Sequence, residues 1–334
     1  MSDRPTRLGA TATLEHTLFE VKRVVVGQDH MLERMLIGLL ARGHVLLEGV
    51  PGVAKTLAVR TLADVFGGSF TRLQFTPDLM PADIVGTQVW RPSTERFDTE
   101  LGPVFANLVL ADEINRAPSK VQSALLEAMA ERQVSIGGNT HRLPTPFLVL
   151  ATQNPIETEG VYALPEAQRD RFLLKVDVDH ADDLDELTIV QRMSVAPPRA
   201  QGVLTVADLV TLQVETDEVF VHHAIAHYAV QLVMATRHPH RFGLSLDDVL
   251  DYGVSARGTL GLVAASRALS ILRGRDYVLP HDVVDIASDV LAHRLVLSFD
   301  AVADGVDPRS VVRSILDVVP APRVAPDEQT AAAA

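Results

Sequence analysis

Short apolar runs alternate with longer segments of helical periodicity in the first half of the chain. Apolar residues dominate the runs at 44–48, 69–75, 107–113, 146–154 and 171–178. Three of these runs are almost continuously hydrophobic, which is typical of strands covered on both faces of a parallel sheet. Between them, segments such as 55–66 and 120–133 repeat apolar positions at the spacing of one helix face. The pattern predicts an α/β fold with five strands and helical crossovers.

Two segments interrupt this alternation. Residues 76–106 are too many for an ordinary connection, and loops of this length are usually functional. Residues 134–143 place a Gly-Gly-Asn turn between two short alternating segments, which predicts a β-hairpin. We therefore expect both segments to be insertions in the α/β core.

The second half of the chain changes to helical periodicity throughout. Helices are predicted at 205–215, 219–236, 246–252, 256–273 and 281–293. An acidic run and a proline-rich stretch before these helices predict a linker, while the proline- and alanine-rich end lacks apolar periodicity. The expected divisions are an N-terminal helical lead-in (1–25), an α/β core (26–180), a linker (181–202), a helical domain (203–318) and a disordered tail (319–334).

Composition narrows the class of protein. With 334 residues, 47% of them apolar, the chain is long enough for a core domain and a smaller companion, and it is too apolar to be disordered. No apolar run approaches the roughly 18 residues of a membrane span, and residues 1–20 lack the apolar centre of a signal peptide, so we expect a cytoplasmic protein. The absence of cysteine excludes disulfides and thiolate metal sites. A net charge of −13 disfavours nucleic acid as a partner, although a local basic loop or pore remains compatible with one.

The stretch LLEGVPGVAKTLAVR, residues 46–60, places a glycine-rich turn between a strand and a helix. In that geometry backbone N–H groups and the helix N-terminus converge on an anion, which favours a phosphate-binding loop over an ordinary one. Lys55 would reach the β- and γ-phosphates of a nucleotide, and Thr56 would offer its hydroxyl to Mg²⁺. Ala54 replaces the usual glycine before this lysine, which is tolerable if the local φ is negative. The expected nucleotide contacts in the loop are Gly49, Val50, Pro51, Gly52, Val53, Ala54, Lys55, Thr56 and Leu57.

Two further strands end in polar residues. Asp112 and Glu113 follow an apolar run, at the strand end where ligands of open α/β sheets gather. Asp112 would hold Mg²⁺ through water, and Glu113 would polarise the water that attacks the γ-phosphate. Alone, such a carboxylate pair is as often a solvated turn, but beside the loop at 49–56 it predicts ATP hydrolysis. Asn154 would help to position the same water, unless it only forms an Asn-Pro turn.

The chain carries a series of short motifs in order. They are VVGQ (25–28), GVPGVAKT (49–56), FTPDLMPADIVG (75–86), GPVF (102–105), LADEINRAP (110–118), LLEAMAERQV (125–134), ATQNPIETEGVYALPEAQRDRF (151–172) and GVSARGTLGL (253–262). Together they resemble a MoxR-type AAA+ ATPase over roughly residues 20–310. Alanine before the P-loop lysine is itself common in this family. The resemblance implies a P-loop AAA+ core with a five-stranded parallel sheet, followed by an all-helical lid domain.

The resemblance also implies roles for residues outside the loop. The residues expected near the adenine of ATP are Val26, Gly27 and Gln28. Arg171 is similar to the arginine finger, which would enter the site of the neighbouring subunit, although Arg169 is a rival for that role. Arg257 is similar to the sensor 2 arginine of the lid. For Arg171 and Arg257 alike, a surface salt bridge is the competing interpretation.

The same resemblance implies a role for the two insertions. In related AAA+ proteins they face the central channel of a ring. Trp90, Arg91 and Phe97 in the first insertion, and the hairpin around Asn139 in the second, would then contact a client protein. The alternative is that Trp90 and Phe97 only close a local apolar cluster.

Four histidines, at 223, 227, 238 and 240, have spacings that suggest a zinc site. They lack the glutamate of an HExxH motif and have no cysteine near them. A partly buried or solvated helix face is therefore the favoured interpretation.

The combined interpretation is an AAA+ chaperone-like motor that binds ATP and Mg²⁺ and remodels or matures client proteins. Because the finger acts in trans, the resemblance implies a ring, with a hexamer expected, and a partner that carries a von Willebrand factor A domain. Two other classes stay open: a nucleic-acid motor similar to the minichromosome maintenance helicases, and a nucleotide-dependent assembly switch. The acidic balance argues against the helicase class, and the presence of Glu113 and Arg171 argues against the switch.

Overall fold

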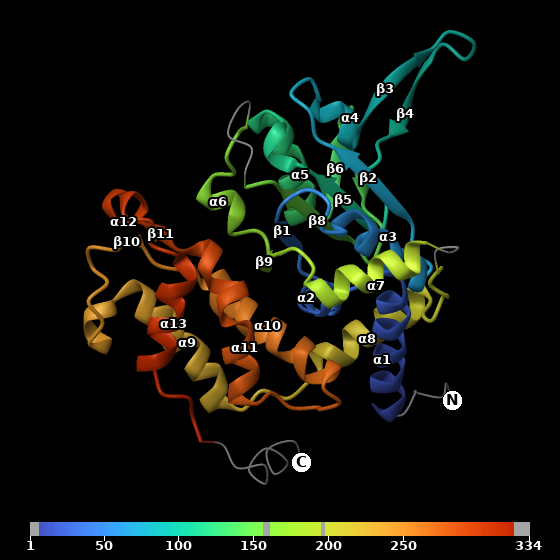
Figure 1. Cartoon of the computed structure of the whole chain (residues 1–334). Coiled ribbons are helices and arrows are strands. Elements are labelled where there is room, and N and C mark those ends of the chain that lie inside the picture. The colour runs from blue at the N-terminus through green and yellow to red at the C-terminus, as the bar shows by residue number, and fades with distance from the viewer. Residues whose placement is uncertain (1–6, 156–160, 195–197, 324–334) are drawn as a thin grey trace.

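The computed structural model describes residues 7–155, 161–194 and 198–323. One part of the molecule holds a parallel sheet with helices on both faces, and the other part is built almost entirely from helices (Figure 1). A two-stranded hairpin extends away from the sheet (Figure 1). This arrangement is the α/β core and helical lid that the sequence predicts.

The central sheet contains five parallel strands in the order β2-β5-β8-β1-β9. They are β1 (Val45–Glu48), β2 (Phe70–Gln74), β5 (Leu108–Asp112), β8 (Leu148–Gln153) and β9 (Leu174–Asp177). Each strand lies within one of the five apolar runs, so the predicted strands are confirmed. Every residue of β5 is buried, which explains why its sequence is continuously apolar up to the final aspartate.

Helices cover both faces of the sheet. The long helices of this part are α1 (Arg7–Val24), α2 (Asp29–Leu40), α3 (Lys55–Val65) and α5 (Ser119–Glu131). Alternate strand residues face different apolar layers: Leu110 packs in one layer with residues of α1, α2 and α3, whereas Val109 packs in the other with residues of α5. The first layer continues into the lid, so core and lid share one body of buried apolar side chains.

Both predicted insertions are folded. Their elements are α4 (Pro81–Val85), β3 (Gly86–Arg91) and β4 (Arg96–Leu101) in the first, and β6 (Gln133–Ile136) and β7 (Asn139–Arg142) in the second. β3 and β4 form an antiparallel hairpin, and so do β6 and β7. Gly137 and Gly138 have φ of 57° and 84°, the positive values that a two-residue hairpin turn requires. The hairpin predicted from the Gly-Gly-Asn turn is therefore present.

The segment expected to be a linker, 181–202, contains helix α7 (Asp183–Met193). The acidic residues that suggested a break lie in the first turn of the helix, where the helix dipole favours negative charge. Asp182 caps the helix by accepting a hydrogen bond from the Asp185 N–H at 2.8 Å. The acidic composition marked a helix start and not a change to irregular chain.

The lid contains six α-helices among the described residues. They are α8 (Val206–Asp217), α9 (His223–Arg237), α10 (Ala256–Leu272), α11 (Pro280–Leu291), α12 (Phe299–Ala303) and α13 (Pro308–Val318). The helix predicted at 246–252 is wrong, because strand β10 (Leu250–Tyr252) lies there and pairs with β11 (Val296–Leu297). The partner strand is far along the chain, so no local pattern reveals the pairing. The lid is thus helical apart from one short antiparallel pair.

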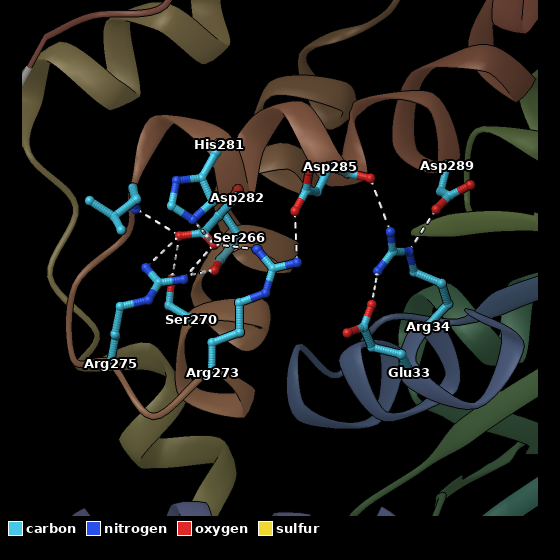
Figure 2. Close-up of polar contacts among 11 residues, drawn as sticks. Glu33, Arg34, Ser266, Ser270, Arg273, Arg275, His281, Asp282, Asp285 and Asp289 are labelled. Carbon is cyan, nitrogen blue, oxygen red and sulfur yellow. Dashed lines mark hydrogen bonds and ion pairs between the residues drawn. The ribbon is translucent and has the colours of Figure 1, made fainter. Parts of the chain in front are cut away.

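Buried ion pairs connect the lid helices and join the lid to the core (Figure 2). Arg273 and Arg275 both donate to the buried carboxylate of Asp282, at the start of α11. Arg34 of α2 donates to Asp289 of α11 at 2.6 Å, and both side chains are almost fully buried. The second pair therefore links the α/β part directly to the lid.

The remaining short elements connect the larger ones. They are α6 (Glu166–Arg169) and the 3-10 helices η1 (Ile114–Arg116), η2 (Pro239–Phe242) and η3 (Ala292–Arg294). Across residues 7–155, 161–194 and 198–323, no helix is long and apolar enough to span a bilayer. Most of the expected disordered tail, 324–334, and the first six residues of the lead-in lie outside the described residues.

Candidate active site

The loop after β1 and the ends of β5 and β8 enclose a pocket at the carboxyl edge of the sheet. Its lining residues are Pro51, Gly52, Ala54, Lys55, Thr56, Leu57, Arg72, Asp112, Glu113, Thr152, Gln153 and Asn154. The residues assigned from the sequence to Mg²⁺ and to the attacking water are all among them. The pocket thus brings together side chains from positions 51 to 154 because parallel strands end at one edge.

The loop between β1 and α3 is held in shape by its own lysine. Lys55 is the first residue of α3, and its Nζ donates to the carbonyls of Gly49 and Val50. The Gly49 N–H donates to the Gln153 carbonyl at 3.2 Å, which joins the loop to β8. Burial lowers the pKa of Lys55, while the nearby carboxylates oppose that change. The ammonium group therefore lies between the loop and the acidic side chains, where it can meet a phosphate.

Ala54 adopts a left-handed conformation, with φ 61° and ψ 16°, so the condition of a negative φ is not met. A residue with a Cβ in this region costs about 1–2 kcal/mol, and glycine avoids that cost. The loop geometry explains why glycine is usual before the lysine. Strain of this kind persists where the surrounding structure imposes it, and it is frequent at ligand sites.

Asp112 is held by two fixed partners. Thr152 Oγ1 donates to Oδ1 at 2.6 Å, and Arg72 donates to Oδ2 through Nε at 3.0 Å and Nη2 at 2.6 Å. The residue as a whole is 8% exposed. Neither Arg72 nor Thr152 was predicted as a site residue. For Arg72 a signal was present, because a charged residue beside Leu73 in an apolar run marks the polar face of an outer strand.

Glu113 is held in the same way at the mouth of the pocket. Its Oε2 accepts from Gln74 Nε2 at 2.8 Å and from Arg116 Nη1 at 3.0 Å, and its N–H donates to Thr152 Oγ1 at 2.8 Å. Its backbone is left-handed, with φ 56°. Gln74 and Arg116 were missed at the sequence level. Their contacts fix a carboxylate that is about one quarter exposed, on a residue that lines the pocket.

The donor set of this pocket fits a nucleotide with its metal ion. An ammonium group, backbone N–H groups and a helix N-terminus are present for phosphates, and the Thr56 hydroxyl and the Asp112 carboxylate are the oxygen ligands that Mg²⁺ prefers. The described residues contain no group of three or more His, Cys, Asp or Glu side chains placed to hold a metal ion. The four histidines of the lid therefore form no zinc site within that part of the chain. A hard cation at Thr56 and Asp112 would need further oxygen ligands from phosphate or water.

The residues expected near adenine lie between α1 and α2. Gln28 Nε2 donates to the Asp179 carbonyl at 3.0 Å, and Gly27, with φ 71°, is packed against the Asp185 side chain at the start of α7. Neither they nor Val26 line the pocket described above. Helix α7, which lies within the expected linker, therefore adjoins this segment.

The three arginines considered for finger and sensor roles do not line this pocket. Arg171 is exposed, and within residues 7–155, 161–194 and 198–323 its side chain forms no hydrogen bond or ion pair. Arg169 lies 3.7 Å from Glu166. Arg257 Nη1 donates to Asp170 Oδ2 at 3.2 Å. Arg257 thus forms the surface salt bridge that was the alternative interpretation, and its side chain is 59% exposed.

The aromatic residues of the first insertion pair with each other on the β3–β4 hairpin. Trp90 and Phe97 are opposite in register, with ring centroids 5.1 Å apart, and are 47% and 64% exposed. Arg91 pairs with Glu100 and Asp98 on β4. Asn139, at the turn of the β6–β7 hairpin, is exposed. The two rings form a local pair, but that pair stays largely open to solvent.

Comparison with protein families gives two matches along the chain. Residues 44–174 match a family described as "ATPase family associated with various cellular activities (AAA)". Residues 247–315 match a family described as "AAA lid domain". The two matches correspond to the parallel sheet with its pocket and to the later part of the helical lid.

Comparison with individual proteins covers nearly the whole chain. The chain is 58% identical over 313 residues to "Chaperone MoxR1" of Mycobacterium tuberculosis, covering 93% of this chain and 83% of that protein. It is 33% identical to "Protein MoxR" of Methylorubrum extorquens, covering 91% and 93%. Among solved structures, a putative ATPase from Cytophaga hutchinsonii is 43% identical and superposes with a TM-score of 0.90, covering 95% of this chain and 97% of that one.

Proposed function

This chain belongs to the MoxR family of AAA+ ATPases, and we propose that it is a Mg²⁺-dependent motor that uses ATP hydrolysis to remodel or mature client proteins. One observation carries the catalytic part of the proposal. Lys55, Thr56, Asp112, Glu113 and Asn154 line a single pocket at the carboxyl edge of the sheet. These are the groups needed to bind phosphates, hold Mg²⁺ and place a water molecule.

Each side chain has a separate task in this mechanism. Lys55 and the N–H groups of the loop bind the β- and γ-phosphates, and Thr56 and Asp112 hold the metal. Bound Mg²⁺ neutralises charge on the phosphates. Glu113 accepts a proton from the attacking water, and Asn154 orients that water from the end of β8. The hydrogen bonds from Gln74 and Arg116 fix the position of the Glu113 carboxylate.

The proposed motor is a ring, with a hexamer expected. Arg171 is exposed and does not line its own pocket, a placement that suits a finger acting on the neighbouring subunit. Arg257 of the lid donates to Asp170, the residue that precedes Arg171 in the chain. We therefore assign the completion of each site to arginines of an adjacent subunit, with Arg171 as the finger.

The proposed client contact lies on the β3–β4 hairpin. Trp90 and Phe97 offer rigid apolar area that is largely exposed, and Arg91 offers a charged donor beside them. Aromatic residues and arginine are the side chains most often found at the energetic centres of protein interfaces. We propose a von Willebrand factor A domain protein as the partner. The chaperone name of a relative that is 58% identical supports a protein client rather than nucleic acid.

Replacement of Trp90, Arg91 and Phe97 by alanine tests this function. The triple variant should keep its basal ATPase and its ring, and it should lose binding of the partner and any stimulation of ATPase by it. A matched control is the double variant Tyr252→Ala with Phe299→Ala, which removes exposed aromatic area from the lid. Normal partner response in the hairpin variant would place client contact elsewhere. Salt-sensitive stimulation by DNA instead of protein would identify a nucleic-acid motor.

A further inference from the structure

Asp170 lies between the two arginines that compete for the finger role, and its carboxylate is bound by the lid. Ser255 Oγ lies 3.0 and 3.2 Å from the two carboxylate oxygens, and Arg257 Nη1 donates to Oδ2 at 3.2 Å. Arg294 Nε of η3 donates to Oδ1 at 3.0 Å. One carboxylate of the core is therefore shared by three side chains of the lid.

The lid also binds the backbone that follows Asp170. His293 Nε2 lies 3.1 Å from the Phe172 carbonyl oxygen, and Arg294 donates to the carbonyls of Phe172 and Leu173. The Arg294 side chain is 3% exposed. Burial lowers the pKa of Arg294 to about 10, and Asp170 opposes that change. Because a buried guanidinium needs a carboxylate partner, the segment 170–173 is held firmly against the lid.

Arg171 lies inside this bound segment, but its side chain takes no part in the contacts with the lid. It is exposed, and within the described part of the chain its side chain forms no hydrogen bond or ion pair. Consecutive Cα atoms are about 3.8 Å apart, so the contacts that fix Asp170 also fix the base of the Arg171 side chain. The guanidinium itself stays available to another molecule.

We propose that Asp170 is a positioning residue for the finger: it ties the segment that carries Arg171 to the lid of its own subunit and holds Arg257 beside it. The inference rests on the proposed role of Arg171 as a finger that acts on the neighbouring subunit. A misplacement of about 1 Å in a reacting group can lower a rate roughly 100-fold. Because this contact positions Arg171, the rate of ATP hydrolysis in the neighbouring subunit should depend on the position of this lid.

A second contact between core and lid supplies a matched control. Arg34 of α2 donates to Asp289 of α11 at 2.6 Å, and its side chain is 5% exposed (Figure 2). This is again a buried guanidinium bound to an aspartate across the same two parts of the molecule. The charged partners of Asp289 are Arg34, His30 and Arg309, and none of them belongs to the finger segment. If Asp170 only stabilises the fold, Asp170→Asn and Asp289→Asn should have the same consequences.

The experiment mixes two kinds of subunit. Acceptor subunits carry Arg171→Ala and keep an intact pocket, and donor subunits carry Glu113→Gln and keep an intact finger. Donors with Glu113→Gln alone should restore ATPase to the acceptors. Donors that also carry Asp170→Asn should restore about 10- to 100-fold less, whereas donors that also carry Asp289→Asn should restore as much as the single variant. Co-assembly is measured by recovering one subunit through a tag on the other, and thermal unfolding is recorded for both double variants.

The outcomes separate this inference from the proposed function. No recovery with the Glu113→Gln donor, despite co-assembly, contradicts Arg171 as the finger, and this inference falls with it. Recovery that is equal for the Asp170→Asn and Glu113→Gln donors overturns the positioning role and leaves the finger in place. Equal losses in the Asp170→Asn and Asp289→Asn donors also overturn it, because the role would then be structural.

Two further measurements test the proposal if the Asp170→Asn donor does not assemble into the ring. Asp170→Asn alone should lower kcat while leaving the KM for ATP unchanged, because Asp170 does not line the pocket of its own subunit. If that variant fails to enter the ring, Ser255→Ala takes its place in the donor, since it removes one lid hydrogen bond from Asp170. Recovery by this donor equal to that of the Glu113→Gln donor would then count against the proposal.

Discussion

The nucleotide pocket and the β3–β4 hairpin hold their functional side chains in opposite ways. In the pocket, Asp112 has Thr152 and Arg72 as partners, and its residue is 8% exposed. On the hairpin, Trp90 and Phe97 contact each other and are 47% and 64% exposed. A group that must meet a small ligand in one geometry is held by several fixed partners. A group that must meet a protein surface keeps its apolar area in solvent.

The two regions are nevertheless joined through one strand. Arg72 and Gln74 of β2 hold Asp112 and Glu113, and the chain then runs directly into α4 and the hairpin. We therefore expect substitutions in the pocket to change turnover or nucleotide affinity strongly. Substitutions on the hairpin should change the stability of the isolated protein little.

The largest effect is expected for Glu113→Gln. The substitution keeps the size of the side chain and removes its ability to accept a proton, so turnover should fall about 10²- to 10⁴-fold. Binding of Mg²⁺-ATP should persist, because Lys55, Thr56 and Asp112 are unchanged. Steady-state ATPase and a nucleotide titration check the two parts, with the exposed Glu127→Gln on α5 as control. Turnover near wild type would mean that another group is the base.

Lys55→Ala should have the next largest effect, on nucleotide binding. The substitution removes charged hydrogen bonds worth about 3 kcal/mol, which corresponds to a roughly 100-fold weaker affinity. It also removes the contacts of Nζ with Gly49 and Val50 that shape the loop. Calorimetric titration with ATP measures the change, with the exposed Lys120→Ala as control. Unchanged affinity would contradict the assignment of this loop to phosphate.

A smaller effect should appear as a dependence of the free energy of unfolding on pH. His44 is buried before β1; its Nδ1 accepts from the Val149 N–H at 2.9 Å, and burial lowers its pKa to about 4. In the unfolded chain the pKa is about 6.5, so the unfolded state binds the proton more readily. Its contribution to stability is complete above pH of about 6.5 and is lost as the pH falls toward 4.

Urea unfolding between pH 7 and pH 4.5 checks this dependence. One histidine can contribute a slope of at most about 1.4 kcal/mol per pH unit. Burial also lowers the pKa of His293, which adds a slope of the same sign. His44→Gln should flatten the curve, whatever its effect on stability at pH 7. The same slope in wild type and variant would remove His44 from the explanation.

The smallest effect is expected for Trp90→Ala on the stability of the isolated protein. The exposed ring contacts Phe97, and an aromatic pair of this kind contributes about 0.5–1.5 kcal/mol. Leu110→Ala in β5 is the reference, because a fully buried leucine costs about 2–5 kcal/mol on truncation. Urea unfolding of the two variants measures both. A Trp90 cost as large as that of Leu110 would break the comparison and make the aromatic pair a structural cluster.

The parts of the site that were predictable from sequence are those that come from consecutive residues. The glycine-rich loop at 49–56 and the acidic pair at 112–113 each follow an apolar run, and every predicted strand is present. The partners of those residues come from elsewhere. Arg72 reaches Asp112 from 40 residues away, and Arg294 reaches Asp170 from 124 residues away. No local pattern indicates such pairs, since they depend on which strands and helices become neighbours.

The sequence by itself determined the order of the strands along the chain, the loop chemistry, the β6–β7 hairpin and the helical nature of the lid, because hydrophobic period and turn residues act over a few positions. Only the tertiary structure decided the rest. The strand order β2-β5-β8-β1-β9 brought Asp112, Thr152 and the loop to one edge. In the folded loop the backbone of Ala54 is left-handed, and residues 250–252 of the predicted helix form a strand that pairs with β11. The lid fixes the residue that precedes Arg171, because the hydrogen-bond partners of the Asp170 carboxylate all come from distant elements of the lid.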